Sequence, residues 1–257
     1  MNFNINELPP EVRDIVGVYP VADFSSSPEA RVFRVGADGE FFLKIAEQKA
    51  LLREAEMDAY LHSLSLGPEV LFYGECSGQD MLLTRRVSGK PLTDSMYLRD
   101  GRRLAISLAE SMRAFHSLPT ELSPVSDRIT PYLKGAYESY ESGARPHSSL
   151  SSYSRLKSHE DAYRILKASE GMLRRDVLIH GDFCLPNVIY DGWRLSGYID
   201  LGCGGVGDRH IDIFWGLWTL NFNLGTDRYS DIFLDAYGRD TVDKERLLAV
   251  SCAEALI

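Results

Sequence analysis

Cysteine is scarce in this 257-residue sequence: its four cysteines lie far apart, and no two of them form a Cys-x-x-Cys pair. Long apolar runs are missing as well, since none approaches the roughly 18 residues that a membrane-spanning helix requires. The N-terminal segment contains neither the basic region nor the apolar core of a secretory signal peptide. Without a secretory context reduced thiols are expected, so we predict a cytoplasmic protein.

Positive charge is also in short supply. The formal net charge is -9 and the pI is near 5.2, which argues against a broad surface for nucleic-acid phosphates. An acidic surface could instead attract a polycation. With 44% hydrophobic and 25% charged residues, the composition is that of a globular protein, long enough for two lobes with separate cores. We expect a monomer or weak dimer that binds neither nucleic acid nor membranes.

Residues 1–86 predict a small, strand-rich lobe. Two β-type runs, 31–35 and 41–45, flank Ala37-Asp38-Gly39 and indicate a hairpin. Residues 70–73 and 81–84 form a second pair of strands. Between the two pairs, residues 47–64 have helical periodicity, with an expected apolar face made of Leu51, Leu52, Ala55, Ala59, Leu61 and Leu64.

Residues 87–257 predict a larger, mainly helical lobe, which begins with the Gly- and Pro-containing linker 87–91. Apolar periodicity indicates helices and a group of short strands. The expected helices are 102–117, 126–141, 153–171, 211–224, 228–237 and 242–256, and the expected strands are 177–179, 188–190 and 194–199. We expect the three tryptophans in the core rather than on a base-stacking surface.

The sharpest signal is a His-Gly-Asp triplet that follows an apolar strand. Asp182 ends this triplet, and Asn187 opens the next apolar strand five positions later. A second carboxylate, Asp200, ends a further strand and is followed by Leu201 and a glycine. Phosphoryl transfer needs one carboxylate to orient the attacking hydroxyl and accept its proton, and an amide and another carboxylate to hold Mg²⁺. Each residue alone could simply cap a turn, but their order and spacing favour phosphotransfer.

Lys44 lies inside the apolar strand 41–45, where an ammonium needs a partner or a ligand. Glu54 and Glu56 lie on the following helix, and a Lys–Glu pair would direct the ammonium at the α- and β-phosphates of ATP. The alternative is a solvated lysine on an edge strand. Upstream, the Ser-Ser-Ser-Pro segment at 25–28 could offer hydroxyls and amides to phosphate oxygens, although it is no Gly-x-Gly-x-x-Gly loop.

Together these residues resemble the aminoglycoside phosphotransferase family, particularly its 3′-type (kanamycin kinase) branch. The segment 178–213, which includes the His-Gly-Asp triplet, carries the likeness most specifically. Weaker matches extend it over nearly the whole chain, at 27–28, 42–44, 53–54 and 236–247. The resemblance implies a two-lobed, protein-kinase-like α+β fold, with a small β-rich N-terminal lobe that binds nucleotide and a larger, mainly helical C-terminal lobe for catalysis and substrate.

The resemblance also implies roles for single residues in the reaction. Asp182 would be the catalytic base, and Asn187 and Asp200 would be the Mg²⁺ ligands. Lys44 would contact phosphate, with Glu54 as its partner.

Further implied roles concern the nucleotide, which is expected to be ATP with GTP as the alternative. Phe42 would lie against the adenine ring, and Ser27 would sit in the loop over the phosphates. The backbone of Arg85–Val87 would be the hinge that meets the adenine edge.

Several departures from the family pattern concern the acceptor. Cys203 stands where the family usually has the arginine of Asp-Leu-Gly-Arg. Aminoglycoside kinases line their acceptor cleft with carboxylates, whereas 147–154 and 221–223 are neutral here. The groups that remain for a cationic acceptor are Asp182, Glu254, the C-terminal carboxylate of Ile257, and Glu160 and Asp161 on a helix.

We therefore predict transfer of the γ-phosphoryl group of ATP to a hydroxyl of an aminoglycoside antibiotic, which confers resistance. A kinase for another small hydroxylated metabolite or antibiotic is an open alternative. A nucleotide-binding pseudokinase scaffold is a third, but the retained Lys44, Asp182, Asn187 and Asp200 argue against it.

Overall fold

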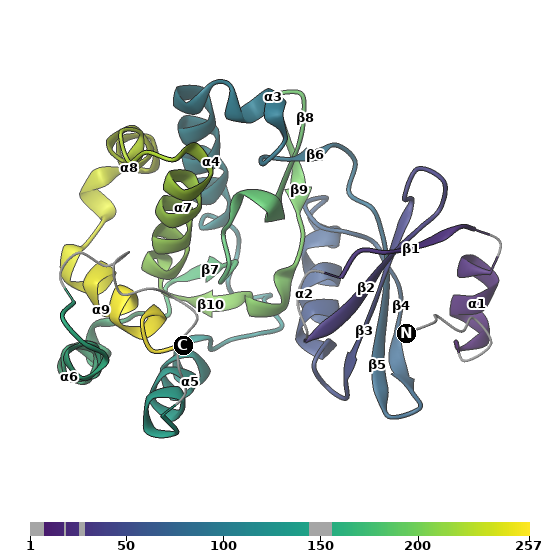
Figure 1. The fold of residues 1–257 in the computed structure, drawn as a ribbon, viewed down its shortest axis with the longest axis horizontal. Coiled ribbons are helices and arrows are strands. Elements are labelled where there is room, and N and C mark those ends of the chain that lie inside the picture. Colours follow the sequence, from purple (N-terminus) through teal and green to yellow (C-terminus); the bar gives the residue numbers. More distant parts are fainter. Residues whose placement is uncertain (1–7, 18, 26–28, 144–155) are drawn as a thin grey trace. The chain divides into compact units, whose positions relative to one another are not determined.

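The computed structural model describes residues 8–17, 19–25, 29–143 and 156–257. Ser27 and the neutral segment 147–154 lie outside the described residues. The chain forms two compact units. Figure 1 labels their helices and strands. Unit 1 contains residues 1–89 and 189–202, and unit 2 contains residues 90–188 and 203–257. Unit 1 thus includes a segment from late in the chain.

Unit 1 is built on a five-stranded antiparallel sheet in the order β1-β2-β3-β5-β4. Both expected hairpins are confirmed, and β1 is an edge strand that the sequence pattern did not predict. Lys44 pairs across from Val32, and Phe42 pairs across from Arg34. Because side chains two apart on a strand point to the same face, Lys44 and Phe42 share one face of the sheet. The strands are β1 (Val21–Asp23), β2 (Ala30–Val35), β3 (Phe41–Glu47), β4 (Val70–Cys76) and β5 (Gln79–Arg85).

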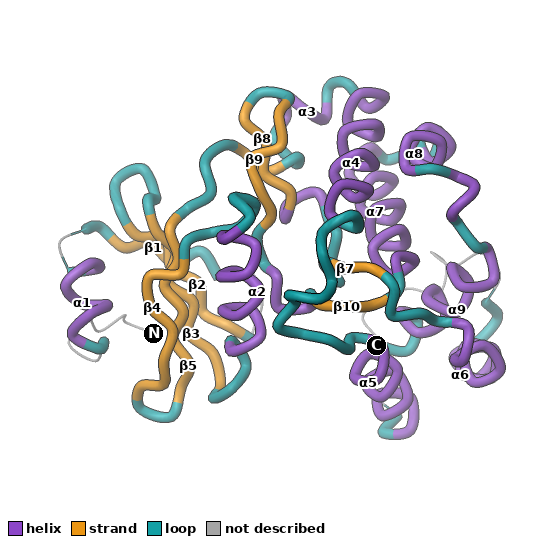
Figure 2. Tube along the Cα trace, turned by 180° about the vertical axis from the view of Figure 1, so that it is seen from behind, coloured by secondary structure: helices purple, strands orange, loops and turns teal. Residues whose placement is uncertain are grey.

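Helices α1 (Pro10–Val16) and α2 (Leu52–Ser63) pack on opposite faces of this sheet (Figure 2). On one face, Val12 of α1 belongs to the same buried cluster as Leu43 and Leu83. On the other, Ala55 of α2 clusters with Leu82. Leu82 is the cross-strand partner of Lys44, so Lys44 lies on the face that α2 covers.

The start of α2 corrects the expected helix 47–64. Strand β3 continues to Glu47, so the helix begins only at Leu52. The predicted apolar face is wrong at Leu52 and Ala59, which are exposed. The buried side of the helix instead carries two carboxyls, Glu54 and Asp58.

Residues 189–202 add a hairpin to unit 1, made of most of β8 (Val188–Asp191) and β9 (Arg194–Tyr198). The backbone N–H of Tyr198 donates to the carbonyl of Leu66 at 2.8 Å, which ties β9 to the segment between α2 and β4. Asp200 follows this hairpin directly.

Unit 2 is mainly helical, and all six expected helices are present within the described residues. Four of them begin after a side chain that caps their first turn, namely Asp100, Ser158, Asp208 or Asp243. A short antiparallel pair joins β7 (Val177–Ile179) to β10 (Gly205–Gly207), a strand that was not predicted. The helices are α3 (Ser95–Leu98), α4 (Gly101–Phe115), α5 (Ile129–Glu141), α6 (His159–Ser169), α7 (Arg209–Leu224), α8 (Ser230–Tyr237) and α9 (Lys244–Glu254), and β6 (Lys90–Pro91) precedes them.

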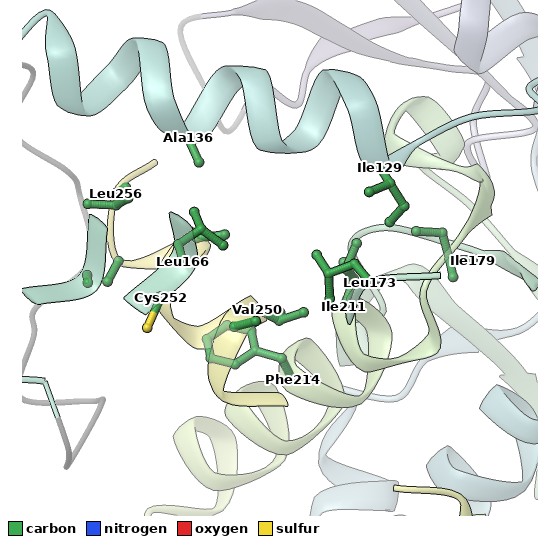
Figure 3. Close-up of a cluster of buried hydrophobic side chains, with 14 of the residues drawn as sticks. Ile129, Ala136, Leu166, Leu173, Ile179, Ile211, Phe214, Val250, Cys252 and Leu256 are labelled. Carbon is green, nitrogen blue, oxygen red and sulfur yellow. The ribbon is translucent and has the colours of Figure 1, made fainter. Parts of the chain in front are cut away.

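The main core of unit 2 lies between α5, α6, α7, α9 and β7 (Figure 3). Leu166, Ile179, Phe214 and Val250 are among its buried side chains. The expectation that the tryptophans are core residues is confirmed only for Trp215, which packs against this core, whereas Trp193 and Trp218 are partly exposed and lie outside it. None of the described helices has both the length and the apolar character needed to cross a membrane.

Candidate active site

In unit 1 the structure brings together Lys44, Glu54 and Asp200. The Lys44 ammonium contacts Oε1 of Glu54 and lies 2.8 Å from Oδ1 of Asp200. Glu54 is buried whereas Glu56, two residues later on α2, is exposed. The expected strand–helix pair is therefore present, and Glu54 is its carboxylate.

The two carboxylates stabilise the charge of Lys44. Burial opposes that charge, but Glu54 and Asp200 outweigh it and raise the pKa of Lys44 above its usual value. Asp200 has a φ of 64°, in the left-handed region that few residues other than glycine adopt. The guanidinium of Arg53 donates to the carbonyl of Gly202 at 3.1 Å, which holds the segment after Asp200 on α2. Such backbone strain is typical of functional sites that the surrounding structure fixes.

A third carboxyl, Asp58, lies one helical turn after Glu54 on the same side of α2. It is buried, and among the described residues its Oδ1 has no hydrogen-bond partner. Burial is the main cause that raises the pKa of Asp58 well above its usual value, and the charge of Glu54 adds to it. Asp58 was not predicted from the sequence, although an aspartate four positions after Glu54 indicates a shared helix face.

In unit 2 Asp182 and Asn187 lie together, as their spacing predicted. The Asn187 side-chain amide donates to Oδ2 of Asp182 at 2.9 Å and to its carbonyl at 3.1 Å. Asn187 ends a short 3-10 turn, Leu185–Asn187, immediately before β8. Because the amide nitrogen is used for Asp182, the amide oxygen is the atom with which Asn187 can bind a cation.

A buried aspartate on α7 fixes the backbone that leads to Asp182. Asp212 accepts hydrogen bonds from the backbone N–H groups of His180 and Gly181, both at 2.8 Å. Its Oδ2 also lies 3.0 Å from Nε2 of His116, whose Nδ1 is 2.8 Å from the hydroxyl of Tyr237. The sequence motif included Asp212, but only the structure reveals this contact.

Position 181 requires a glycine for two reasons, the backbone conformation and the lack of space for a side chain. Its φ is 81°, and a Cβ there would come within 2.2 Å of the carbonyl oxygen of Cys203. That carbonyl accepts a hydrogen bond from Nε of Arg128 at 2.9 Å. A guanidinium therefore lies beside residue 203, even though the arginine expected at that position is absent.

A second buried network joins α9 to the start of α7. Asp208 accepts from Nδ1 of His210 at 2.6 Å and from the guanidinium of Arg246 at 3.0 Å. Burial works against the charge of Asp208, but the hydrogen bonds from the His210 ring and from the backbone N–H groups of His210 and Arg174 lower its pKa to about 2. The N–H of Asp243 donates to Nε2 of His210 at 2.8 Å, so both ring nitrogens of His210 are held within this network.

Glu254 is the acceptor candidate whose surroundings are best defined. Its Oε1 accepts from the hydroxyl of Tyr132 at 2.8 Å, and the indole N–H of Trp215 also hydrogen-bonds to this carboxyl. Burial nevertheless raises the pKa of Glu254 to about 7, and the negative charge of Asp182 contributes. Glu254 and Asp182 are thus close enough to interact electrostatically.

The other acceptor candidates differ in exposure and in ion pairing. Asp161 forms an ion pair with Arg164 at 2.7 Å, so its charge is partly neutralised. Glu160 and Ile257 are exposed. Of the two carboxylates of α6, Asp161 is therefore the one whose charge is already paired with an arginine.

The nucleotide candidates Phe42, Arg85 and Val87 lie in unit 1. The partly exposed ring of Phe42 is 6.1 Å from that of Phe24. The side chain of Arg85 pairs with Glu69 at 2.7 Å, so a nucleotide contact at the 85–87 hinge would come from the backbone.

Comparison with known proteins places these features in a family context. Residues 21–248 match the family model described as the phosphotransferase enzyme family. A probable aminoglycoside 3′-phosphotransferase of Lactococcus lactis is 41% identical over 99% of this chain and 97% of its own length. An aminoglycoside 3′-phosphotransferase of Niallia circulans is 31% identical over 96% of both chains.

Solved structures give the same picture. A type VIII aminoglycoside 3′-phosphotransferase superimposes with a TM-score of 0.77 at 26% identity, over 96% of this chain and 98% of its own. An aminoglycoside phosphotransferase of Streptomyces rimosus, solved with ADP and streptomycin, gives a TM-score of 0.72 at 25% identity, over 95% and 96% of the chains. The resemblance and the two-lobed α+β fold predicted from the sequence are confirmed.

Proposed function

We propose, because the chain belongs to the aminoglycoside phosphotransferase family, that it transfers the γ-phosphoryl group of ATP to a hydroxyl of an aminoglycoside antibiotic and thereby confers resistance. Family membership makes the chain an O-phosphotransferase, a kinase for an alcohol group. The observation that carries the proposal is the retention of both reactive groupings, Asp182 with Asn187 in unit 2 and Lys44 with Glu54 and Asp200 in unit 1. The need for ATP points to the cytoplasm as the place of reaction.

Asp182 is the proposed catalytic base. The Asn187 amide orients its carboxylate, and Asp212 fixes the two backbone N–H groups before it. A carboxylate held in this way can orient the attacking hydroxyl and accept its proton as the bond to phosphorus forms.

Lys44 is the proposed phosphate contact. Its raised pKa keeps it protonated at every physiological pH, and Glu54 holds the ammonium on the α2 face of the sheet. An ammonium placed in this way stabilises the negative charge of the α- and β-phosphates. The ADP bound by the relative from Streptomyces rimosus supports an adenine nucleotide, and Phe42, Ser27 and the 85–87 backbone are proposed to contact it.

Asp200 and Asn187 each carry an oxygen atom of the kind that magnesium binds. Mg²⁺ prefers carboxylate and amide oxygens and needs few protein ligands. Asp200 provides a carboxylate whose side chain is 53% exposed, and Asn187 provides its amide oxygen. When bound, the ion would neutralise charge on the phosphate oxygens. We propose Asn187 and Asp200 as its protein ligands.

For the acceptor we propose Glu254 as the main partner of an ammonium group. Asp182, the C-terminal carboxylate of Ile257, Glu160 and Asp161 are proposed as further partners of the cationic acceptor. An ammonium beside Glu254 would favour its ionised form and lower its pKa. Acceptor binding should therefore weaken as the pH falls below about 7, where free Glu254 becomes protonated.

A coupled ADP-release assay over a panel of aminoglycosides and neutral alcohols tests this function. We expect release with at least one aminoglycoside, a KM that rises with salt because screening weakens partly exposed ion pairs, and about 100-fold or greater loss of turnover in Asp182→Ala. A bacterium expressing the wild type should also tolerate more of that aminoglycoside than one expressing Asp182→Ala. Release with a neutral alcohol alone, without salt dependence, would support a different small-molecule kinase.

Glu254→Gln tests the acceptor site separately. It should raise the KM for the aminoglycoside about 10-fold or more, the worth of a charge-assisted hydrogen bond, and leave the KM for ATP nearly unchanged. Glu245→Gln is the matched control, because it removes the same charge from an exposed position of the same helix. Equal effects on both KM values would contradict an acceptor role for Glu254.

A further inference from the structure

Helix α7 of unit 2 carries three aromatic side chains, Trp215, Trp218 and Phe222, which we name the aromatic row. The ring centroids of Trp215 and Trp218 are 5.4 Å apart at an angle of 80°, and those of Trp218 and Phe222 are 5.1 Å apart and almost parallel, at 8°. Residues three and four positions apart share one side of a helix. Trp215 packs against the core, whereas Phe222 is 70% exposed, so the row leads from the core to the surface.

The inner end of the row meets a buried carboxyl. The indole N–H of Trp215 and the hydroxyl of Tyr132 both hydrogen-bond to Glu254. Glu254 is only 7% exposed, and it interacts electrostatically with Asp182. The aromatic row therefore begins at the proposed ammonium partner, within electrostatic range of the proposed base and inside one unit.

The outer end of the row lies in the neutral stretch Asn221-Phe222-Asn223, where the resemblance implies acidic residues. Both amides are used within the protein. Oδ1 of Asn221 accepts from the hydroxyl of Ser230 at 3.0 Å, and Nδ2 of Asn223 donates to the carbonyl of Thr219 at 2.8 Å. Phe222 is the exposed residue of the three. An aromatic ring thus takes the place at which carboxylates were expected.

We propose that the aromatic row is an acceptor-binding wall, on which one amino-sugar ring of the acceptor stacks while an ammonium of the acceptor pairs with Glu254. This inference rests on the proposed function. The C–H side of a pyranose ring is apolar and gains from leaving water against an aromatic face. An ammonium near an indole is further stabilised by the negative face of the ring. The wall would let this enzyme bind a cationic sugar with fewer carboxylates, and select acceptors by ring shape as well as by charge.

Steady-state kinetics of Phe222→Ala tests the wall, with the aminoglycoside that gives the fastest ADP release from the wild type. Phe222 is exposed, so its loss should leave folding intact. We expect the KM for the aminoglycoside to rise about three- to tenfold, as for one lost ring contact, with kcat and the KM for ATP unchanged. Phe222→Trp, which keeps an aromatic ring at this position, should keep the wild-type KM for the aminoglycoside. Leu122→Ala, which removes another exposed apolar side chain of unit 2 with 73% exposure, should change neither KM.

Tryptophan fluorescence gives a readout without turnover. Titrating the same aminoglycoside into nucleotide-free wild type should change the emission, and Trp218→Phe should lose most of that change while keeping a stacking ring. An unchanged aminoglycoside KM in Phe222→Ala, with an active wild type, would overturn the wall and leave the proposed function standing. If the wild type phosphorylates no aminoglycoside, both proposals fall. A change only in the oligomeric state of Phe222→Ala, measured by sedimentation, would assign the row to contact between copies and also overturn the wall.

Discussion

Replacing Asp58 by asparagine should stabilise the protein at neutral pH. Asp58 is 1% exposed, and no atom in the part of the chain that the structure describes hydrogen-bonds to its Oδ1. Burial, with a contribution from the charge of Glu54, raises the pKa of Asp58 well above its usual value of 3.8. In the unfolded chain the same carboxyl ionises close to that usual value. Folding near neutral pH must therefore either protonate Asp58 or bury its charge, whereas asparagine imposes neither cost.

The size of the effect follows from proton linkage. Folded protein keeps the Asp58 proton to a higher pH than unfolded protein does, so stability that is fully present below pH 3.8 is lost as the pH rises toward the folded-state pKa. Each pH unit in this window costs up to about 1.4 kcal/mol. The gain from Asp58→Asn should thus grow from near zero at about pH 4 to at least about 1 kcal/mol at about pH 7.

Urea unfolding between about pH 5 and about pH 8, followed by circular dichroism, measures this gain as the difference in unfolding free energy from wild type. Glu56→Gln is the control, because it removes the same charge from an exposed position of α2. Its difference should stay within about 0.5 kcal/mol at every pH. A difference for Asp58→Asn that does not grow with pH would show that Asp58 holds no buried proton.

Two further predictions concern the ion pairs of each unit. Lys44→Met should raise the KM for ATP about 10-fold or more, since a charge-assisted contact is worth about 1.5–3 kcal/mol. Glu54→Gln should raise this KM more mildly, and Glu56→Gln should leave it unchanged. A large effect of Glu56→Gln in the ADP-release assay would contradict the observed helix register. Asp208→Asn should lower the unfolding free energy by roughly 3–5 kcal/mol, because it removes the buried anion of Arg246 and leaves its guanidinium only the half-exposed carboxylate of Asp243, at 3.6 Å. In wild type the contribution of Asp208 should be present above about pH 4 and disappear as the pH falls toward its folded pKa of about 2, which acid unfolding of the two proteins would measure.

Local pattern was enough to predict most helices and strands and to single out the candidate site residues. A helix or strand is fixed largely by the spacing of apolar side chains, which recurs every three to four or every two residues. The order of Asp182, Asn187 and Asp200 is likewise a property of the chain, because each follows or opens an apolar strand of its own. These residues could be chosen without knowing what lies beside them.

Long-range contacts decided the rest. Both Glu54 and Glu56 lie on the predicted helix, and the packing of α2 on the sheet makes Glu54 the buried partner of Lys44 and leaves Glu56 exposed. The same orientation of α2 buries Asp58, although the apolar periodicity of the sequence predicts only apolar side chains on the buried side of this helix. Such choices depend on pairing between strands far apart in sequence, which local periodicity does not encode.

Residues with a supporting role were beyond prediction for the same reason. Asp212 acts on His180 and Gly181 from 31 or 32 positions away, and Trp215 reaches Glu254 only because α7 and α9 pack in one core. The exposure of Phe222 depends on which side of α7 the core covers. A side chain is identified by the sequence, but its neighbours are set by the packing of elements that fold together from distant parts of the chain.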